Sequence, residues 1–107
     1  MSDELSQPSV NTRDREYGLA TLDESDRHRL LVSERRRVLL EALSDYTPPV
    51  DLEEMARAVA AREDSLYQDK HENVDEVSIT LHHIHLPMMA DFGVLDYDPD
   101  SNRIKTW

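Results

Sequence analysis

The C-terminal stretch NVDEVSITLHHIHLPMMADFGVLDYDPDSNRIKTW constrains the fold of this chain more than any other. Asn73 and Glu76 have the spacing of a capping box, which predicts a helix over residues 74–91. Gly93 supplies the left-handed conformation in which helices often end. Beyond it, two runs of alternating apolar and polar residues flank a turn-forming PDSN sequence, which predicts a β-hairpin. The predicted strands are residues 94–98 and 103–107.

Within the predicted helix, apolar residues lie on more than one face. The main face is predicted to consist of Val77, Leu81, Ile84 and Met88. Ile79, Leu86 and Met89 fall away from that face. Pro87 lies in the same region, and a proline inside a helix bends it. Either Pro87 kinks the helix so that its last turn presents a new face, or the second face packs on another subunit. We expect a kink with some contact to a second subunit.

Further helices are predicted upstream, over residues 23–32, 34–46 and 52–62. Ser33 is a modest interruption, so the first two can also run on as one helix. The predicted helix starts are the capping boxes Thr21 with Glu24 and Asp51 with Glu54, and the single cap Ser33. Residues 1–20 are polar and show no apolar period, which predicts a disordered tail before a domain at 21–107. This order predicts an α+β fold, a winged helix-turn-helix with three to four helices followed by a C-terminal two-stranded β-hairpin wing.

Charge and composition exclude several classes of protein. Twenty-three Asp and Glu face twelve basic residues, and the net charge is −11. Acid excess with few lysines is what a cytoplasm of molar salt favours, although an ordinary acidic protein or a nucleic-acid mimic has a similar balance. The absence of cysteine excludes a disulfide framework and a thiolate metal site. We expect a cytoplasmic protein, because no apolar run is long enough to span a membrane and no signal peptide begins the chain.

The runs RRRVLLEAL at 35–43 and LHHIHLPMMADFGVLDYDPDSNRI at 81–104 resemble a family of small winged-helix domains from halophilic archaea. The second run is also similar to ArsR-type repressors. The matching positions are His85, Leu86, Met89 and Gly93, and this match implies that Leu86 and Met89 belong to the core. The resemblance covers residues 35–107 and implies a winged-helix fold, DNA binding and dimers.

Candidate chemistry is sparse. His82, His83 and His85 are the only dense group of metal-capable side chains, and two of them could share a zinc ion. The alternative is that they are polar residues on the rim of a helix, and we predict neither a metal nor a cofactor. Ser65 and Ser78 have no fixed histidine and acid partners in the sequence, so an enzyme is not expected.

The sequence contains few side chains that could contact DNA. Thr80 and His83 could reach base edges from the long helix, although that helix contains no Arg or Lys. Arg103 and Lys105 on the hairpin are predicted to contact phosphates. Upstream, Arg35 and Arg36 either contact phosphates too or form ion pairs on a solvated helix.

Two functions therefore remain open. The first is a DNA-binding transcriptional regulator that acts on double-stranded DNA as a homodimer in high salt. The alternative is a winged-helix module for protein interaction or dimerisation that does not bind DNA. For the homodimer, the predicted contact residues are Leu30, Leu31 and Trp107, because large apolar groups near chain ends usually need a partner surface.

Overall fold

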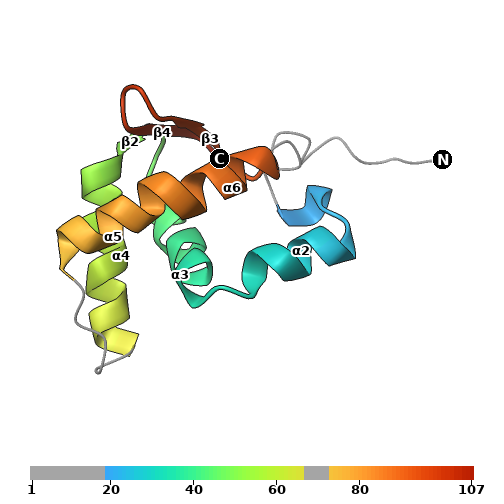
Figure 1. Cartoon of the computed structure of the whole chain (residues 1–107), viewed down its shortest axis with the longest axis horizontal. Helices are drawn as coiled ribbons and strands as arrows, with labels where there is room; N and C mark the ends of the chain where they lie inside the picture. Colours follow the sequence, from blue (N-terminus) through green and yellow to red (C-terminus); the bar gives the residue numbers. More distant parts are fainter. Residues whose placement is uncertain (1–18, 67–72) are drawn as a thin grey trace.

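The computed structural model describes residues 19–66 and 73–107. The predicted tail lies outside these residues, except that Leu19 and Ala20 belong to a short 3-10 helix, η2, Leu19–Thr21. The described part is an α+β fold with four helices and a small antiparallel sheet (Figure 1). The helices are α2 (Glu24–Leu31), α3 (Glu34–Leu43), α4 (Leu52–Leu66) and a continuous run of α5 (Val74–Thr80), η3 (Leu81–His85) and α6 (Leu86–Asp91). The strands are β2 (Val50–Asp51), β3 (Asp96–Asp98) and β4 (Arg103–Thr106).

Local capping sets the starts of three helices. Asn73 and Glu76 form the predicted reciprocal capping box at the start of α5. Ser33 caps α3 as expected, through a 3.3 Å hydrogen bond from the Arg36 amide. The predicted box of Thr21 with Glu24 is wrong, because Asp23 caps α2 and accepts from the Asp26 amide. An aspartate closer to the helix satisfies the same free amides.

The sheet contains one strand more than the predicted hairpin. Its order is β2-β4-β3, so the short strand β2 pairs antiparallel with the last strand of the chain. Asp51 lies in β2 opposite Arg103 and gives its carboxylate to that side chain, not to the predicted capping box. The Leu52 amide at the start of α4 instead donates to the Asn102 carbonyl at 2.8 Å. The hairpin turn thus meets the start of α4.

A turn of π-helix keeps the buried face of the long helix continuous. The Leu86 amide donates to the Leu81 carbonyl, five residues back, where an α-helix would use a carbonyl four residues back. The extra residue in this wide turn brings Leu86 and Met89 to the face already occupied by Leu81. The predicted burial of Leu86 and Met89 is confirmed. The prediction that Ile84 shares a face with Val77 and Leu81 is wrong, because those two are buried and Ile84 is exposed. Pro87 lies at the start of α6, where its missing amide costs least.

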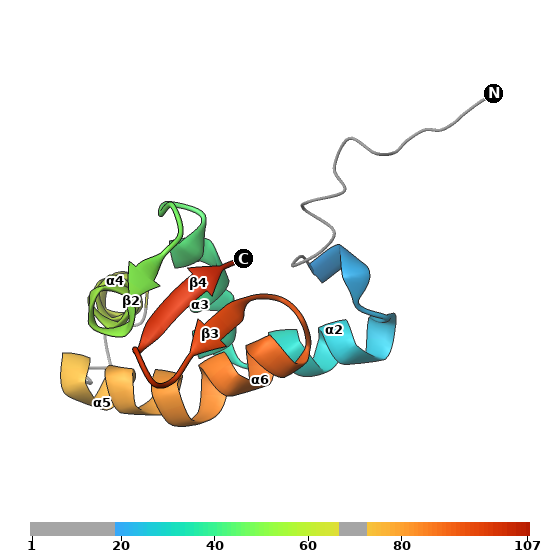
Figure 2. The same ribbon diagram turned by 90° about the horizontal axis from the view of Figure 1, so that it is seen from above.

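One core joins the helices to the sheet. It takes side chains from α3, α4, the α5–α6 run and the strands, and α2 contributes Leu30. The sheet lies across one side of the helices, and α2 lies at the α6 end, away from α4 (Figures 1 and 2). A cation–π contact between Arg29 and the Phe92 ring, 5.5 Å from its centroid, joins α2 to that end. None of the described helices combines the length and apolar composition that a membrane span requires.

Candidate macromolecule-binding face

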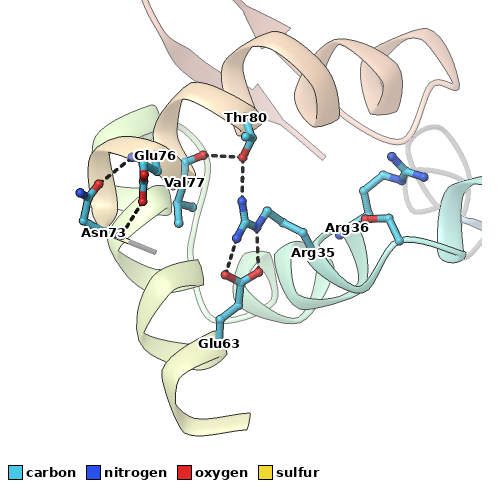
Figure 3. Close-up of polar contacts among 8 residues, drawn as sticks. Arg35, Arg36, Glu63, Asn73, Glu76, Val77 and Thr80 are labelled. Carbon is cyan, nitrogen blue, oxygen red and sulfur yellow. Dashed lines mark hydrogen bonds and ion pairs between the residues drawn. The ribbon is translucent and has the colours of Figure 1, made fainter. Parts of the chain in front are cut away.

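Arg35 points into the molecule and joins three helices. Its Nε and Nη2 donate to the two carboxylate oxygens of Glu63 at 2.8 and 2.7 Å, and its Nη1 donates to Thr80 Oγ1 at 2.8 Å (Figure 3). The Arg35 and Glu63 side chains are 13% and 8% exposed. This bidentate pair ties α3 to α4, and Thr80 adds α5. Arg35 is therefore an internal group.

The Thr80 hydroxyl makes its hydrogen bonds within the same cluster. Its hydroxyl accepts from Arg35 and donates to the Val77 carbonyl at 3.1 Å. The side chain is half-buried. A hydroxyl whose proton is already donated inside the helix has little left to offer a base edge. The structure therefore assigns Thr80 a role in positioning α5 against α3.

Arg36 is also internal, and it closes the end of α2. Its Nε donates to the Leu30 carbonyl at 2.7 Å and its Nη2 to the Arg29 carbonyl at 3.0 Å. These are carbonyls that the end of a helix leaves without partners. Burial lowers the pKa of Arg36. Arg36, like Arg35, is thus bonded inside the molecule, and the predicted DNA contacts of both residues stay predictions.

The three histidines of the π segment have different surroundings. His85 Nδ1 lies 3.3 Å from Arg36 Nη1, and burial, followed by the charges of Arg36 and Arg35, lowers its pKa to about 4. Since an arginine only donates, a neutral His85 accepts this bond. His82 Nδ1 lies 2.6 Å from the Tyr97 hydroxyl, while His83 is exposed. Among residues 19–66 and 73–107, no three His, Asp or Glu side chains are arranged to hold a metal ion.

The hairpin carries the exposed cations of the predicted DNA face. Arg103 Nε donates to Asp51 Oδ1 at 3.0 Å, and the Arg103 side chain remains 49% exposed. Lys105 is exposed on the same strand. Hydrogen bonds from Ser101 and Asp100, with a smaller effect of Lys105, lower the pKa of Asp98 in this hairpin. Arg103 and Lys105 thus remain accessible, as the sequence suggested.

Every arginine in the described ranges is bonded to acceptors of its own chain. The pairs are Arg27 with the Leu19 and Leu22 carbonyls, Arg29 with Asp26, Arg35 with Glu63, Arg36 with the Leu30 carbonyl, Arg37 with the Leu31 carbonyl, Arg57 with Glu53, Arg62 with Asp45 and Arg103 with Asp51. The exposed pairs are weak and can exchange partners. The buried ones cannot, because separating them would leave a charge without compensation.

The outer side of the α5–α6 run combines exposed apolar residues with acids. Ile79 and Ile84 are 58% and 53% exposed, and His83 and Pro87 lie exposed beside them. We call these four residues the outer patch. Residues 74–91 contain three acids and no Arg or Lys. The acids are Asp75, Glu76 and Asp91, all of them exposed.

Two hollows border the same helix. A pocket of about 280 Å³ lies beside Ile84, where the start of α3 meets Glu63 and Thr80. A wider hollow of about 710 Å³ lies between the hairpin turn and the starts of α4 and α5. Its lining includes four carboxylates and one arginine. These are Asp51, Glu53, Glu54 and Asp75, with Arg57 paired to Glu53. Both hollows are thus bordered by acids.

The predicted dimer residues divide into internal and accessible groups. Leu30 is fully buried in the core of its own chain, so it is not available to a partner. Leu31 and Trp107 are half-buried, and Trp107 packs against the core. Val32, between α2 and α3, is exposed. The homodimer itself stays a prediction.

Sequence reasoning missed Glu63 and the pairing of Asp51 with Arg103. A signal for Glu63 was present, because this acid continues the apolar positions of Ala56 and Val59 on α4. A carboxylate on the buried side of a helix indicates a buried cationic partner. The spacing alone could not identify Arg35 as that partner.

These features define a small α+β domain in which one long helix exposes two isoleucines among acids. Residues 28–105 match the family described as Domain of unknown function (DUF7344), and the chain belongs to that family. No curated protein and no solved structure was found to match the chain.

Proposed function

We propose that this domain is a winged helix-turn-helix that works as a protein-interaction module. Support for the fold is the order α3, β2, α4, α5–α6, β3, β4 together with the strand order β2-β4-β3. In this reading α4 and the α5–α6 run form the helix-turn-helix, and the β3–β4 hairpin is the wing. The fold alone does not decide what the domain binds, since function depends on the site.

The observation that carries the proposal is the outer patch. In a DNA-reading winged helix, this side of the second helix enters the major groove between two rows of phosphates. Here it offers Ile79 and Ile84 with acids along the helix, and the arginines of α3 are internal. A contiguous exposed apolar patch with a polar rim is typical of protein-binding surfaces. Protein is therefore the better ligand for this face.

Quantitative DNA titration tests this proposal. Fluorescence anisotropy of the whole chain with duplex DNA from its own upstream region, at about 0.15 M and at molar KCl, should show no preference over random duplex. Both salts are needed because the Debye length falls from about 8 Å to about 3 Å, which removes long-range repulsion. A sequence preference in either salt would contradict the proposal.

The second candidate is a DNA-binding transcriptional regulator, and the wing favours it. Arg103 and Lys105 are exposed there, and His83 is exposed on the helix. If this candidate holds, replacing both wing residues by Ala should weaken binding equally for all sequences, since phosphate contacts carry no sequence information. Replacing His83 should instead reduce the preference for the operator by about 1–3 kcal/mol. Unchanged affinity in both variants would leave no support for this candidate.

A further inference from the structure

The exposed isoleucines of the outer patch and the charges around it favour one kind of partner. Ile79 and Ile84 expose more than half of their surface, at either side of the junction between α5 and η3. The 280 Å³ pocket beside Ile84 gives this surface a concave border. Ile84 is the one apolar residue of the pocket lining, and the others are Ser33, Glu34, Arg35, Glu63, Thr80 and His85. A partner side chain at this border therefore meets polar groups next to the apolar surface of Ile84.

The exposed charged side chains around the patch are acids. Asp75, Glu76 and Asp91 are exposed on the same helical run, and the exposed Glu34 lines the pocket beside Ile84. Residues 74–91 contain no Arg or Lys. A partner that covers the isoleucines therefore brings its flanking residues against carboxylates. Complementary charge at the rim of an interface favours encounter and excludes partners of the wrong sign.

We propose that the outer patch binds an amphipathic helical segment of another protein, an inference that rests on the proposed function. This segment has apolar residues at helical spacing, flanked by Arg and Lys. A second copy of this chain fits less well, because it would bring the same acids and a further net charge of −11 to the interface. Duplex DNA fits less well for the same reason, because its phosphates would face the carboxylates.

The probe is a synthetic peptide of about 18 residues, made of Leu and Lys in amphipathic helical order. A scrambled peptide of the same composition has the same charge but no apolar face. An analogue with Glu in place of Lys has the apolar face but the opposite charge. Titration of the whole chain by fluorescence anisotropy should show tightest binding to the amphipathic Lys peptide. Equal binding of the Glu analogue, or of the scrambled peptide, would overturn the proposal.

Two double variants locate the site. Ile79→Ser with Ile84→Ser should weaken binding of the Lys peptide by at least about tenfold, because two apolar contacts are lost. The matched control is Val32→Ser with Leu66→Ser, which removes exposed apolar residues, 65% and 56% exposed, outside the patch. The control should bind within about twofold of the parent chain. Circular dichroism verifies that both variants keep the helical fold.

The outcomes separate this proposal from the proposed function. Equal weakening in both variants, or in neither, would overturn the outer patch as the site while leaving a protein-interaction role intact. Sequence-specific DNA binding that is lost in the patch variant would overturn both. A dimer in sedimentation that the patch variant abolishes would assign the surface to a second copy and would also overturn the proposed partner.

Discussion

The ion pair of Arg35 with Glu63 determines which side chains are available to an external ligand. The pair is bidentate and nearly buried, and the Thr80 hydroxyl accepts a hydrogen bond from the third nitrogen of the guanidinium. Burial removes two charges from water at a cost that only good geometry offsets. The consequence is that Arg35 cannot serve an external ligand while the helices stay packed.

Removing one partner of this pair should be costly. Glu63→Ala leaves the buried Arg35 without compensation and should lower the free energy of unfolding by about 3–5 kcal/mol in urea denaturation. The control Glu53→Ala breaks an exposed pair, in which Arg57 and Glu53 are 59% and 75% exposed, and should cost at most about 1 kcal/mol. Similar losses in the two variants would show that the internal pair is not special.

His85 gives the chain a predictable response to acid. Its pKa in the folded chain is about 4, below the ordinary value of 6.5, so the unfolded chain takes up this proton first. Stability from this group is fully present above pH 6.5 and is lost as the pH falls toward 4. His85→Gln should make the unfolding free energy less dependent on pH between 6.5 and 5. The difference stays below the limit of about 1.4 kcal/mol per pH unit for one proton, since His85 is half-exposed.

Urea denaturation at pH 6.5, 5.8 and 5 measures this effect, in a range where most carboxylates remain ionised. His83→Gln is the matched control, because His83 is exposed and lies on the same π segment. The control should follow the parent chain. A parent chain no more acid-sensitive than His85→Gln would contradict the lowered pKa.

At the residue scale, the sequence identified types of group better than their partners. Asn73 and Glu76 interact as expected because both members of a capping box lie within one turn. Arg35 lies far along the chain from its partner Glu63, and no local spacing encodes that distance. Residues whose roles depend on contacts between helices were therefore assigned to the surface in error.

At the scale of elements, the α5–α6 run is the feature that most determines what the domain presents. The π turn moves Ile84 outward and Leu86 inward. Segments with an extra residue in a helix are frequent at functional sites. In this chain the extra residue exposes an isoleucine at the outer patch while keeping the core face continuous.

A deletion and an insertion test that interpretation. In a Pro87→Ala background, deleting His83 should restore ordinary α-helical spacing and keep Leu86 and Met89 buried. Inserting one Ala after His83 should instead rotate both side chains out of the core and lower the unfolding free energy by about 3–6 kcal/mol, from two buried side chains. Thermal unfolding of the two variants measures the difference. Equal destabilisation would mean that the π turn does not set the helix register.

Helices were more predictable than strands for a physical reason. Helical periodicity and caps are local, so the helices were found, although α3 ends at Leu43 before the predicted 46 and α4 extends to Leu66 beyond the predicted 62. Strand β2 spans two residues and exists only through its pairing with β4. No local alternation can indicate a strand of that length, and the third strand of the sheet was missed.

For the whole molecule, charge is the dominant property. A net charge of −11 on 107 residues makes the compact state repel itself at low ionic strength. We expect the melting temperature to rise from about 0.1 M to molar KCl, as the Debye length falls from about 10 Å to about 3 Å. Calorimetry in KCl, with uncharged sucrose as the control for excluded cosolvent, measures this. A flat or falling curve would contradict adaptation to high salt.

The most direct measurement of the central claim is amide chemical-shift mapping of the whole chain by NMR, with the Lys peptide and a DNA duplex added separately. We predict that the peptide shifts the amides of Ile79 to Leu86 and of the start of α3, and that DNA shifts neither. Peptide shifts elsewhere, or DNA shifts centred on His83, Arg103 and Lys105, would contradict it.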